Sequence, residues 1–229
     1  METLLSSLSV GGLSIAIVVA LCAGLVKGLV GFAMPMVMIA GLSTILPPDL
    51  ALAGLILPTL ASNLWQALRQ GVRAALASIA RFRVFLLAGA SVMVLTAQLV
   101  PVLPPAALYL SIGPLVTAYG LATLLGHGLR AARGSGARGE AGLGALAGFF
   151  GGMSGIWGPP TVAMLTARAT PKPEQMRVQG VIYGLGSVLL LVSHLGSGVL
   201  RAETVPLSLA LLPPALAGIA IGFRLHDRI

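Results

Sequence analysis

Residues 24–35 read GLVKGLVGFAMP, and residues 148–159 read GFFGGMSGIWGP. When the first stretch is shifted by 124 positions, its three glycines and its proline fall on the same residue types in the second. The matching pairs are Gly24/Gly148, Gly28/Gly152, Gly31/Gly155 and Pro35/Pro159. Self-similarity at a fixed spacing indicates an internal duplication. The chain is therefore interpreted as two copies of one unit.

The composition is that of a membrane protein. Of the 229 residues, 57% are hydrophobic and only 9% are charged, whereas a soluble domain has about 25% charged residues. This excludes a soluble enzyme and a disordered chain, and the single cysteine excludes a disulfide scaffold. The net charge is +8, but the basic residues lie between apolar runs rather than among aromatics on a polar face. Nucleic acid is therefore not an expected partner.

A polar, glycine-rich stretch at 128–139 divides the chain. We predict a first transmembrane repeat over 1–127, a cytoplasmic linker over 128–139 and a second transmembrane repeat over 140–229. The apolar runs that form the repeats are 13–46, 50–68, 84–100, 105–127, 140–167, 178–199 and 204–223.

The first apolar run is too long for an ordinary span. As one helix, residues 13–46 would measure about 50 Å at about 1.5 Å per residue, against a hydrocarbon core of about 30 Å. We expect this run and 140–167 to break near Pro35 and Pro159 and to double back. A single steeply tilted span is the alternative. The Gly-x3-Gly spacing also fits plain close packing of helices.

The basic residues favour the doubling-back interpretation, because cytoplasmic loops carry an excess of Lys and Arg. If each glycine-rich run crosses the membrane once, eight basic residues lie inside and five outside. If each run returns to the side it entered from, twelve lie inside and only Arg201 lies outside. We therefore predict an all-α polytopic membrane protein made of two inverted repeats. Each repeat would have a broken, doubling-back segment followed by transmembrane helices.

The second repeat lacks a counterpart of the final helix of the first. Under the 124-residue shift, residues 106–127 would map to about 230–251, beyond the last residue of the sequence, Ile229. The sequence leaves open whether the protein naturally ends there.

Lys27 is the charged residue that lies midway through an apolar run. An intramembrane charge is costly, and it indicates a functional site by default. The alternative is a lysine that snorkels to the membrane interface. We predict that Lys27 supplies fixed positive charge to a binding site for a small anion.

Broken helices would complete this site with backbone N–H groups and positive helix ends. We expect the substrate-binding residues to be Lys27, Gly28, Gly31, Asn63, Gly152, Ser154, Gly155 and Trp157. For any single polar residue, an ordinary interhelical hydrogen bond is the alternative.

Two further residues are weaker candidates. His194 could relay a proton and Arg177 could anchor an anion, but a structural histidine and a basic residue at the cytoplasmic face are the preferred explanations. One cysteine, three scattered histidines and six acids offer no metal-ligand spacing. We therefore predict no metal, no cofactor and no catalytic residue.

The chain resembles the sulfite exporter TauE/SafE family of bacterial membrane permeases. The likeness lies in the glycine-rich stretch at 24–35, PPDLALA from Pro47, the helix containing Asn63, and the 148–160 stretch followed by Arg177. The resemblance implies secondary transport of small anions such as sulfite, sulfonates and related sulfur or carboxylate compounds. Family members usually carry one more helix at the C-terminus.

The sequence thus predicts a transporter rather than an enzyme, namely a multi-pass permease or exporter of a small anion in the bacterial inner membrane. The lipid bilayer and the anion are its expected partners, and a homo-oligomer stays an option. A passive anion channel and a non-transporting membrane assembly protein are the alternatives.

Overall fold

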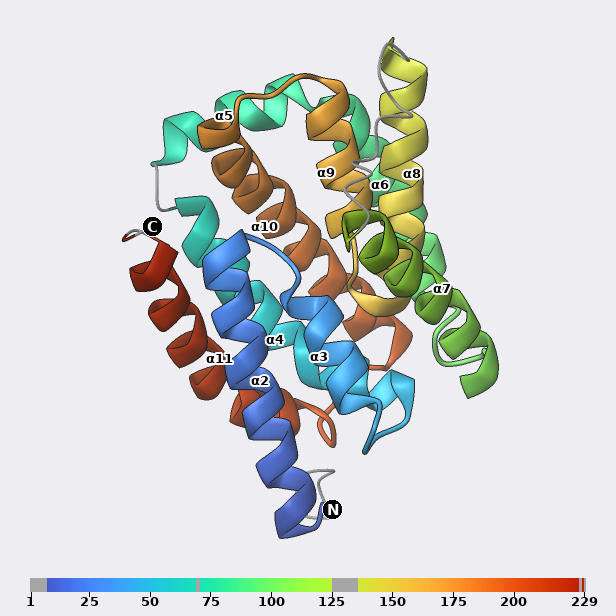
Figure 1. Cartoon of the computed structure of the whole chain (residues 1–229). Helices are drawn as coiled ribbons and strands as arrows, with labels where there is room; N and C mark the ends of the chain where they lie inside the picture. Colours follow the sequence, from blue (N-terminus) through green and yellow to red (C-terminus); the bar gives the residue numbers. More distant parts are fainter. Residues whose placement is uncertain (1–7, 69–70, 125–135, 227, 229) are drawn as a thin grey trace.

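The computed structural model describes residues 8–68, 71–124, 136–226 and 228, and every regular element among them is a helix (Figure 1). This agrees with the predicted all-α fold. The helices are α2 (Val10–Val30), α3 (Met34–Leu42), α4 (Pro48–Leu68), α5 (Val72–Arg81), α6 (Arg83–Ala97), α7 (Pro105–Leu124), α8 (Gly136–Ser154), α9 (Gly158–Ala167), α10 (Lys172–Ser197) and α11 (Val205–His226).

Four of these helices are long and apolar enough to cross a membrane, and one bent pair would be a fifth span. The four are α2, α4, α10 and α11. The bent pair is α5 and α6, whose axes differ by 81°. The protein is therefore a multi-pass membrane protein.

Both glycine-rich runs are broken helices. α2 ends where Gly31 adopts a φ of 83°, and α8 ends where Gly155 adopts a φ of 71°. This left-handed conformation stops a helix and strongly favours glycine. Each following helix carries a proline in its first turn, a position that tolerates a residue without an N–H group. The predicted breaks near Pro35 and Pro159 are thus confirmed.

Each broken run doubles back on itself (Figure 1). Near the end of α3, Gly41 packs against the side chain of Val19 in the middle of α2. Near the end of α9, Arg168 pairs with Glu140 at the start of α8. Both contacts require the short helix to run antiparallel to the long one. The α2–α3 and α8–α9 segments are therefore helical hairpins, and the single tilted span is wrong.

Glycines also let two pairs of helices pack in close contact. Gly28 of α2 lies against Gly222 of α11, where an added Cβ would come within 2.7 Å of the Gly222 Cα. On the other side of the bundle, a Cβ at Gly148 of α8 would lie 2.9 Å from the carbonyl carbon of Gly89 in α6. The Gly-x3-Gly motifs thus serve close packing, whereas Gly31 and Gly155 make the turns.

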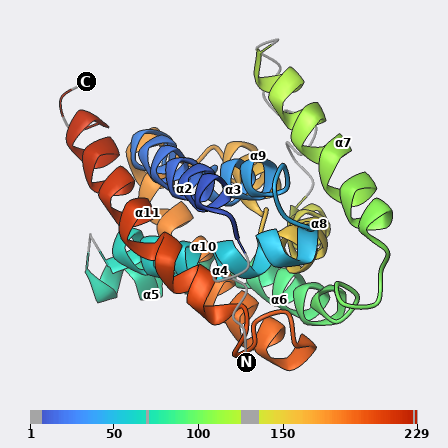
Figure 2. The same cartoon turned by 90° about the horizontal axis from the view of Figure 1, so that it is seen from below.

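The packed pairs flank two central helices. Seen from below in Figure 2, α4 and α10 lie between the α2/α11 pair and the α6/α8 pair. A glycine brings the central helices together, since Gly180 of α10 lies against the backbone of Gln66 in α4. Side chains from α4 and α10 therefore reach the middle of the bundle.

The two breaks are separated by the same 124 residues as the sequence motifs, and each is followed by a central helix. This spacing is consistent with two copies of one unit, but the repeat and its inversion stay predictions. α8 begins at Gly136, inside the stretch 128–139 that was predicted to be a cytoplasmic linker. The rest of it, 128–135, lies outside the described residues.

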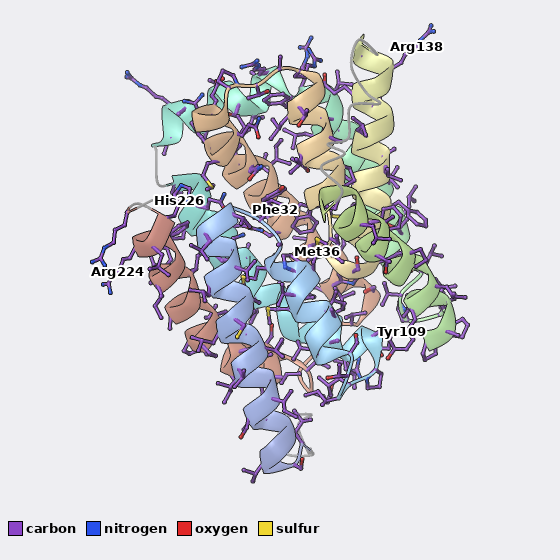
Figure 3. All side chains as sticks on the ribbon, viewed as in Figure 1. Phe32, Met36, Tyr109, Arg138, Arg224 and His226 are labelled. Atoms are coloured by element: carbon purple, nitrogen blue, oxygen red, sulfur yellow. The ribbon has the colours of Figure 1, made fainter. Side chains whose placement is uncertain are left out.

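α5 was not predicted, because it is too polar to appear among the apolar runs. It carries Arg73 and Arg81 beside exposed apolar residues such as Val72 and Leu76. A short amphipathic helix of this kind suits the membrane interface. Arg138 and Arg224 project from the ends of other helices (Figure 3). The assignment of these basic ends to the cytoplasm stays a prediction.

We expect Gly24→Ala to destabilise the protein, because the new Cβ would lie 3.0 Å from the Ile219 nitrogen and closer still to the Ala215 carbonyl. Overpacking of this kind costs about 1–3 kcal/mol. The thermal unfolding midpoint in detergent measures the effect. Gly11→Ala is the matched control, because its Cβ would meet only the Ser9 hydroxyl at 3.9 Å. Equal midpoints for the two variants would contradict close packing at Gly24.

Candidate anion-binding site

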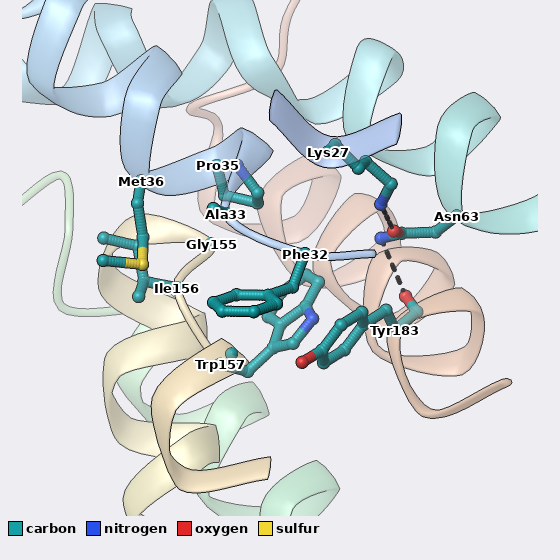
Figure 4. A pocket seen from close by; sticks show the side chains of 11 residues that line it. Lys27, Phe32, Ala33, Pro35, Met36, Asn63, Gly155, Ile156, Trp157 and Tyr183 are labelled. Atoms are coloured by element: carbon teal, nitrogen blue, oxygen red, sulfur yellow. Dashed lines mark hydrogen bonds between the residues drawn. The ribbon is translucent and has the colours of Figure 1, made fainter. Parts of the chain in front are cut away.

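The site is built around Lys27, which lies one helical turn before the break in α2. Its side chain is 1% exposed, and its ammonium group donates a hydrogen bond to Oδ1 of Asn63 on α4. The Asn63 Nδ2 group donates in turn to the main-chain carbonyl of Tyr183 on α10, at 3.0 Å (Figure 4). One chain of hydrogen bonds thus joins α2, α4 and α10 in the middle of the bundle.

Lys27 has no carboxylate partner among the described residues. The acids that form ion pairs there are Glu140, Glu174 and Glu203, and all of them pair with arginines. An ammonium group has three donors, and only one of them is used on Asn63. The side chain is buried inside the bundle. A buried cation without a counter-charge is costly unless something compensates it, and a bound anion would do so.

A small cavity of about 10 Å³, roughly enough for one water molecule, adjoins Lys27, and both hairpin turns line it. The first turn contributes four residues from Phe32 to Met36, and the second contributes four from Gly155 to Gly158. α4 and α10 contribute one residue each. The lining residues are Lys27, Phe32, Ala33, Pro35, Met36, Asn63, Gly155, Ile156, Trp157, Gly158 and Tyr183.

Two helix N-termini meet at this cavity. The first helical hydrogen bond of α3 runs from the Val37 N–H to the Ala33 carbonyl, and that of α9 runs from the Thr161 N–H to the Trp157 carbonyl. The free N–H groups are therefore those of Met34 and Met36 in α3 and of Gly158 in α9. The prolines in these first turns have no N–H group. The helix dipole places partial positive charge at both ends. α3 and α9 begin at lining residues, so both of these positive ends flank Lys27.

Aromatic side chains form the remaining wall (Figure 4). The Trp157 and Tyr183 rings lie 6.4 Å apart, and the Lys27 ammonium lies 6.0 Å from the centre of the Tyr183 ring. The indole N–H of Trp157 makes no hydrogen bond with the described residues, and it is a donor only. The cavity therefore presents donors and positive charge, which is the arrangement that an anion requires.

The structure brings together some of the predicted binding residues and separates others. Lys27, Asn63, Gly155, Trp157 and the break residue Pro35 all line the cavity. Their role in binding stays a prediction.

The other predicted binding residues do not line it. Gly28 and Gly152 pack against α11 and α6, and Gly31 packs against Met176 and Gln179 of α10. The Ser154 hydroxyl donates to the Phe150 carbonyl and accepts from the Ile156 N–H, so it supports the second turn from behind.

The two weaker candidates also lie away from the cavity lining. His194 contacts the Gly152 carbonyl at 2.8 Å and the Ser197 hydroxyl at 3.1 Å, which fits a structural histidine. Arg177 pairs with Glu174 at 2.6 Å and is partly exposed, as expected for a residue near the membrane surface. No group of three or more metal-ligating side chains was found among the described residues.

Sequence reasoning missed Phe32, Ala33 and Met36 as lining residues. They lie between the turn glycine and the first residues of α3, and apolar side chains carry no signal of chemistry. Their position inside the predicted break was the available signal. Tyr183 is one polar residue among several in its helix, so the sequence gives no reason to single it out.

A helical membrane protein in which two broken hairpins meet at a buried lysine has the architecture of a membrane transporter. The family model described as "Sulfite exporter TauE/SafE" matches residues 16–229, which is nearly the whole chain. The chain belongs to this family, whose members are membrane transporters rather than enzymes. No curated protein and no solved structure matched the chain.

We expect Asn63→Ala to lower the thermal unfolding midpoint, because it removes the acceptor for Lys27 and the donor to the Tyr183 carbonyl. Losing a hydrogen bond to a charged group costs about 1.5–3 kcal/mol. Ser62→Ala is the matched control, since the buried Ser62 hydroxyl bonds only the Thr59 carbonyl of its own helix. A midpoint for Asn63→Ala equal to that of Ser62→Ala would contradict the importance of this hydrogen-bond chain.

Proposed function

We propose that the protein is a secondary transporter that moves a small anion across the bacterial inner membrane. The observation that carries the proposal is the buried Lys27 ammonium, which has no carboxylate partner among the described residues and lies at a cavity flanked by two helix N-termini. Family membership supports transport in general. Sulfite, an organosulfonate, or a related sulfur or carboxylate compound is the proposed substrate.

The chemistry of the lining residues supports a compact oxyanion. Lys27 would supply the charge, and the indole N–H of Trp157 would donate a hydrogen bond. The N–H groups of Met34 and Met36 in α3 and of Gly158 in α9 would be the main-chain donors. A sulfite or sulfonate group has several oxygens that can accept from donors arriving from different directions. Asn63 would hold Lys27 in place and share its ammonium group with the anion.

Movement of the substrate would follow from the way the bundle is divided. Glycine contacts bind α2 to α11 and α8 to α6, so each pair can move as one body. Rocking of the α6/α8 pair against α4, α10 and the α2/α11 pair would open the cavity to one side of the membrane and then to the other, as in alternating access. Protons or the membrane potential would drive the cycle.

Replacing Lys27 tests the site directly. We expect Lys27→Met to weaken anion binding by at least about tenfold, or about 1.4 kcal/mol, and to abolish transport of ³⁵S-labelled sulfite into vesicles. Anion-dependent thermal stabilisation gives the affinity, in a screen of sulfite, sulfonates, thiosulfate and small carboxylates. Ser62→Ala should transport normally, and Lys27→Arg should retain partial anion binding. Unchanged affinity and transport in Lys27→Met would remove Lys27 from the site.

The same vesicles distinguish a transporter from a passive anion channel. A coupled transporter accumulates the anion against its gradient, and an uncoupler abolishes the accumulation. A channel only equilibrates the anion with the electrochemical gradient. Anion binding without any flux would favour the non-transporting alternative.

A further inference from the structure

We propose that the protein binds one acyl chain of an anionic phospholipid in the groove between α6 and α10, with the lipid phosphate at Arg83. The groove has a volume of about 500 Å³, and α8 also contributes to its lining. This inference does not depend on the substrate or on the transport activity proposed above.

The groove faces outward and is apolar along nearly its whole length. Leu87 on α6 is 68% exposed, and Val192 on α10 is 59% exposed. Other lining residues include Ala90, Met93 and Leu189. Apolar side chains exposed on a membrane-spanning bundle face lipid, and a hollow among them suits a flexible hydrocarbon chain.

Arg83 is the charged residue of the groove lining. It is exposed and makes no ion pair or hydrogen bond with the described residues, whereas the neighbouring Arg81 pairs with Glu174. Arg83 is also the first residue of α6, directly after the sharp bend that follows the amphipathic helix α5. This position puts an unpaired guanidinium near the membrane interface, where it can bind a lipid phosphate bidentately.

The opposite side of the bundle shows why the groove is open. There, Leu207 and Leu211 of α11 are fully buried against Gly54 of α4. The Ser208 hydroxyl fastens this contact by donating to the Gly54 carbonyl and accepting from the Leu57 N–H.

The residues of α6 at the 124-residue offset from Leu207, Ser208 and Leu211 are Arg83, Val84 and Leu87. An arginine replaces the first buried leucine, a valine without a hydroxyl replaces the serine, and Leu87 is exposed instead of buried. The α6–α10 side therefore lacks the contacts that close the α4–α11 side, and it offers a charge at the end of an apolar channel. That combination matches an anionic phospholipid.

The groove reaches the wall of the anion cavity. Trp157 lines both spaces, and Gly186 of α10 leaves room beside its indole ring, since an added Cβ would lie 3.5 Å from the ring. A bound acyl chain would thus rest against the tryptophan that forms one side of the Lys27 cavity. A change in lipid composition would therefore change the contacts of Trp157, which forms part of the wall of the Lys27 cavity.

Trp157 provides the experiment, because the chain has only one other tryptophan, Trp65. A Trp65→Phe protein is reconstituted in phosphatidylcholine vesicles with increasing amounts of phosphatidylglycerol or phosphatidylcholine brominated on the acyl chains. Bromine quenches tryptophan only at short range, and Trp157 is 4% exposed. We expect the quenching to saturate with both brominated lipids. Half-saturation should need an about fivefold lower fraction of brominated phosphatidylglycerol than of brominated phosphatidylcholine, since one interfacial basic residue contributes about 1 kcal/mol.

Two pairs of variants, each made in the Trp65→Phe background, decide the outcome. Arg83→Gln should remove the preference for the anionic lipid, whereas Arg73→Gln, which removes an exposed charge outside the groove, should keep it. Ala90→Phe should fill the groove and abolish saturable quenching, whereas Leu95→Phe, on the exposed surface of α6, should not.

Equal quenching by the two brominated lipids, or equal behaviour of Arg83→Gln and Arg73→Gln, would overturn the proposal. The proposal would also be overturned if Ala90→Phe disrupted a dimer and left lipid quenching unchanged, because the groove would then hold a second copy of the chain. If Ala90→Phe does not fold, the two arginine variants decide the question alone.

Discussion

The hydrogen bond from Lys27 to Asn63 is the interaction on which the centre of the structure depends. A charged ammonium group inside a membrane protein is expensive unless polar partners surround it. Asn63 supplies one acceptor and is itself held by the Tyr183 carbonyl. Three helices must therefore meet at one depth in the bundle. Under the proposed function, a bound anion would compensate the charge at that meeting point.

The two hairpins reach the Lys27–Asn63 hydrogen bond because glycines have two different structural roles in them. Gly28 and Gly148 let long helices lie backbone to backbone, which stabilises the outer pairs α2/α11 and α6/α8. Gly31 and Gly155 reverse the chain and start short helices at the cavity. At the outer end of the second hairpin, Arg168 pairs with the buried Glu140, and Glu140 also accepts a hydrogen bond from the Phe85 N–H. The open end of the second hairpin is thereby fixed relative to α6.

The two sides of the bundle differ in helix packing, although the 124-residue repeat in the sequence predicts similar packing on both sides. On one side Leu207, Ser208 and Leu211 seal α11 to α4, and on the other Arg83 and Leu87 leave a groove between α6 and α10. Because Trp157 separates that groove from the anion cavity, the surrounding lipid and the bound anion would act on opposite faces of one side chain. Sequence similarity between the halves did not reveal this difference.

The sequence by itself determined that the chain belongs in a bilayer, that its two long apolar runs break near Pro35 and Pro159, and that Lys27 stands apart from the other charges. Charge count, run length and proline position carry these conclusions without any knowledge of packing. Only the tertiary structure decided which glycines turn the chain and which pack it, because close approach and left-handed backbone both require the same residue. It also decided that Phe32 and Met36 line the cavity, since the sequence does not show which residues surround an apolar side chain.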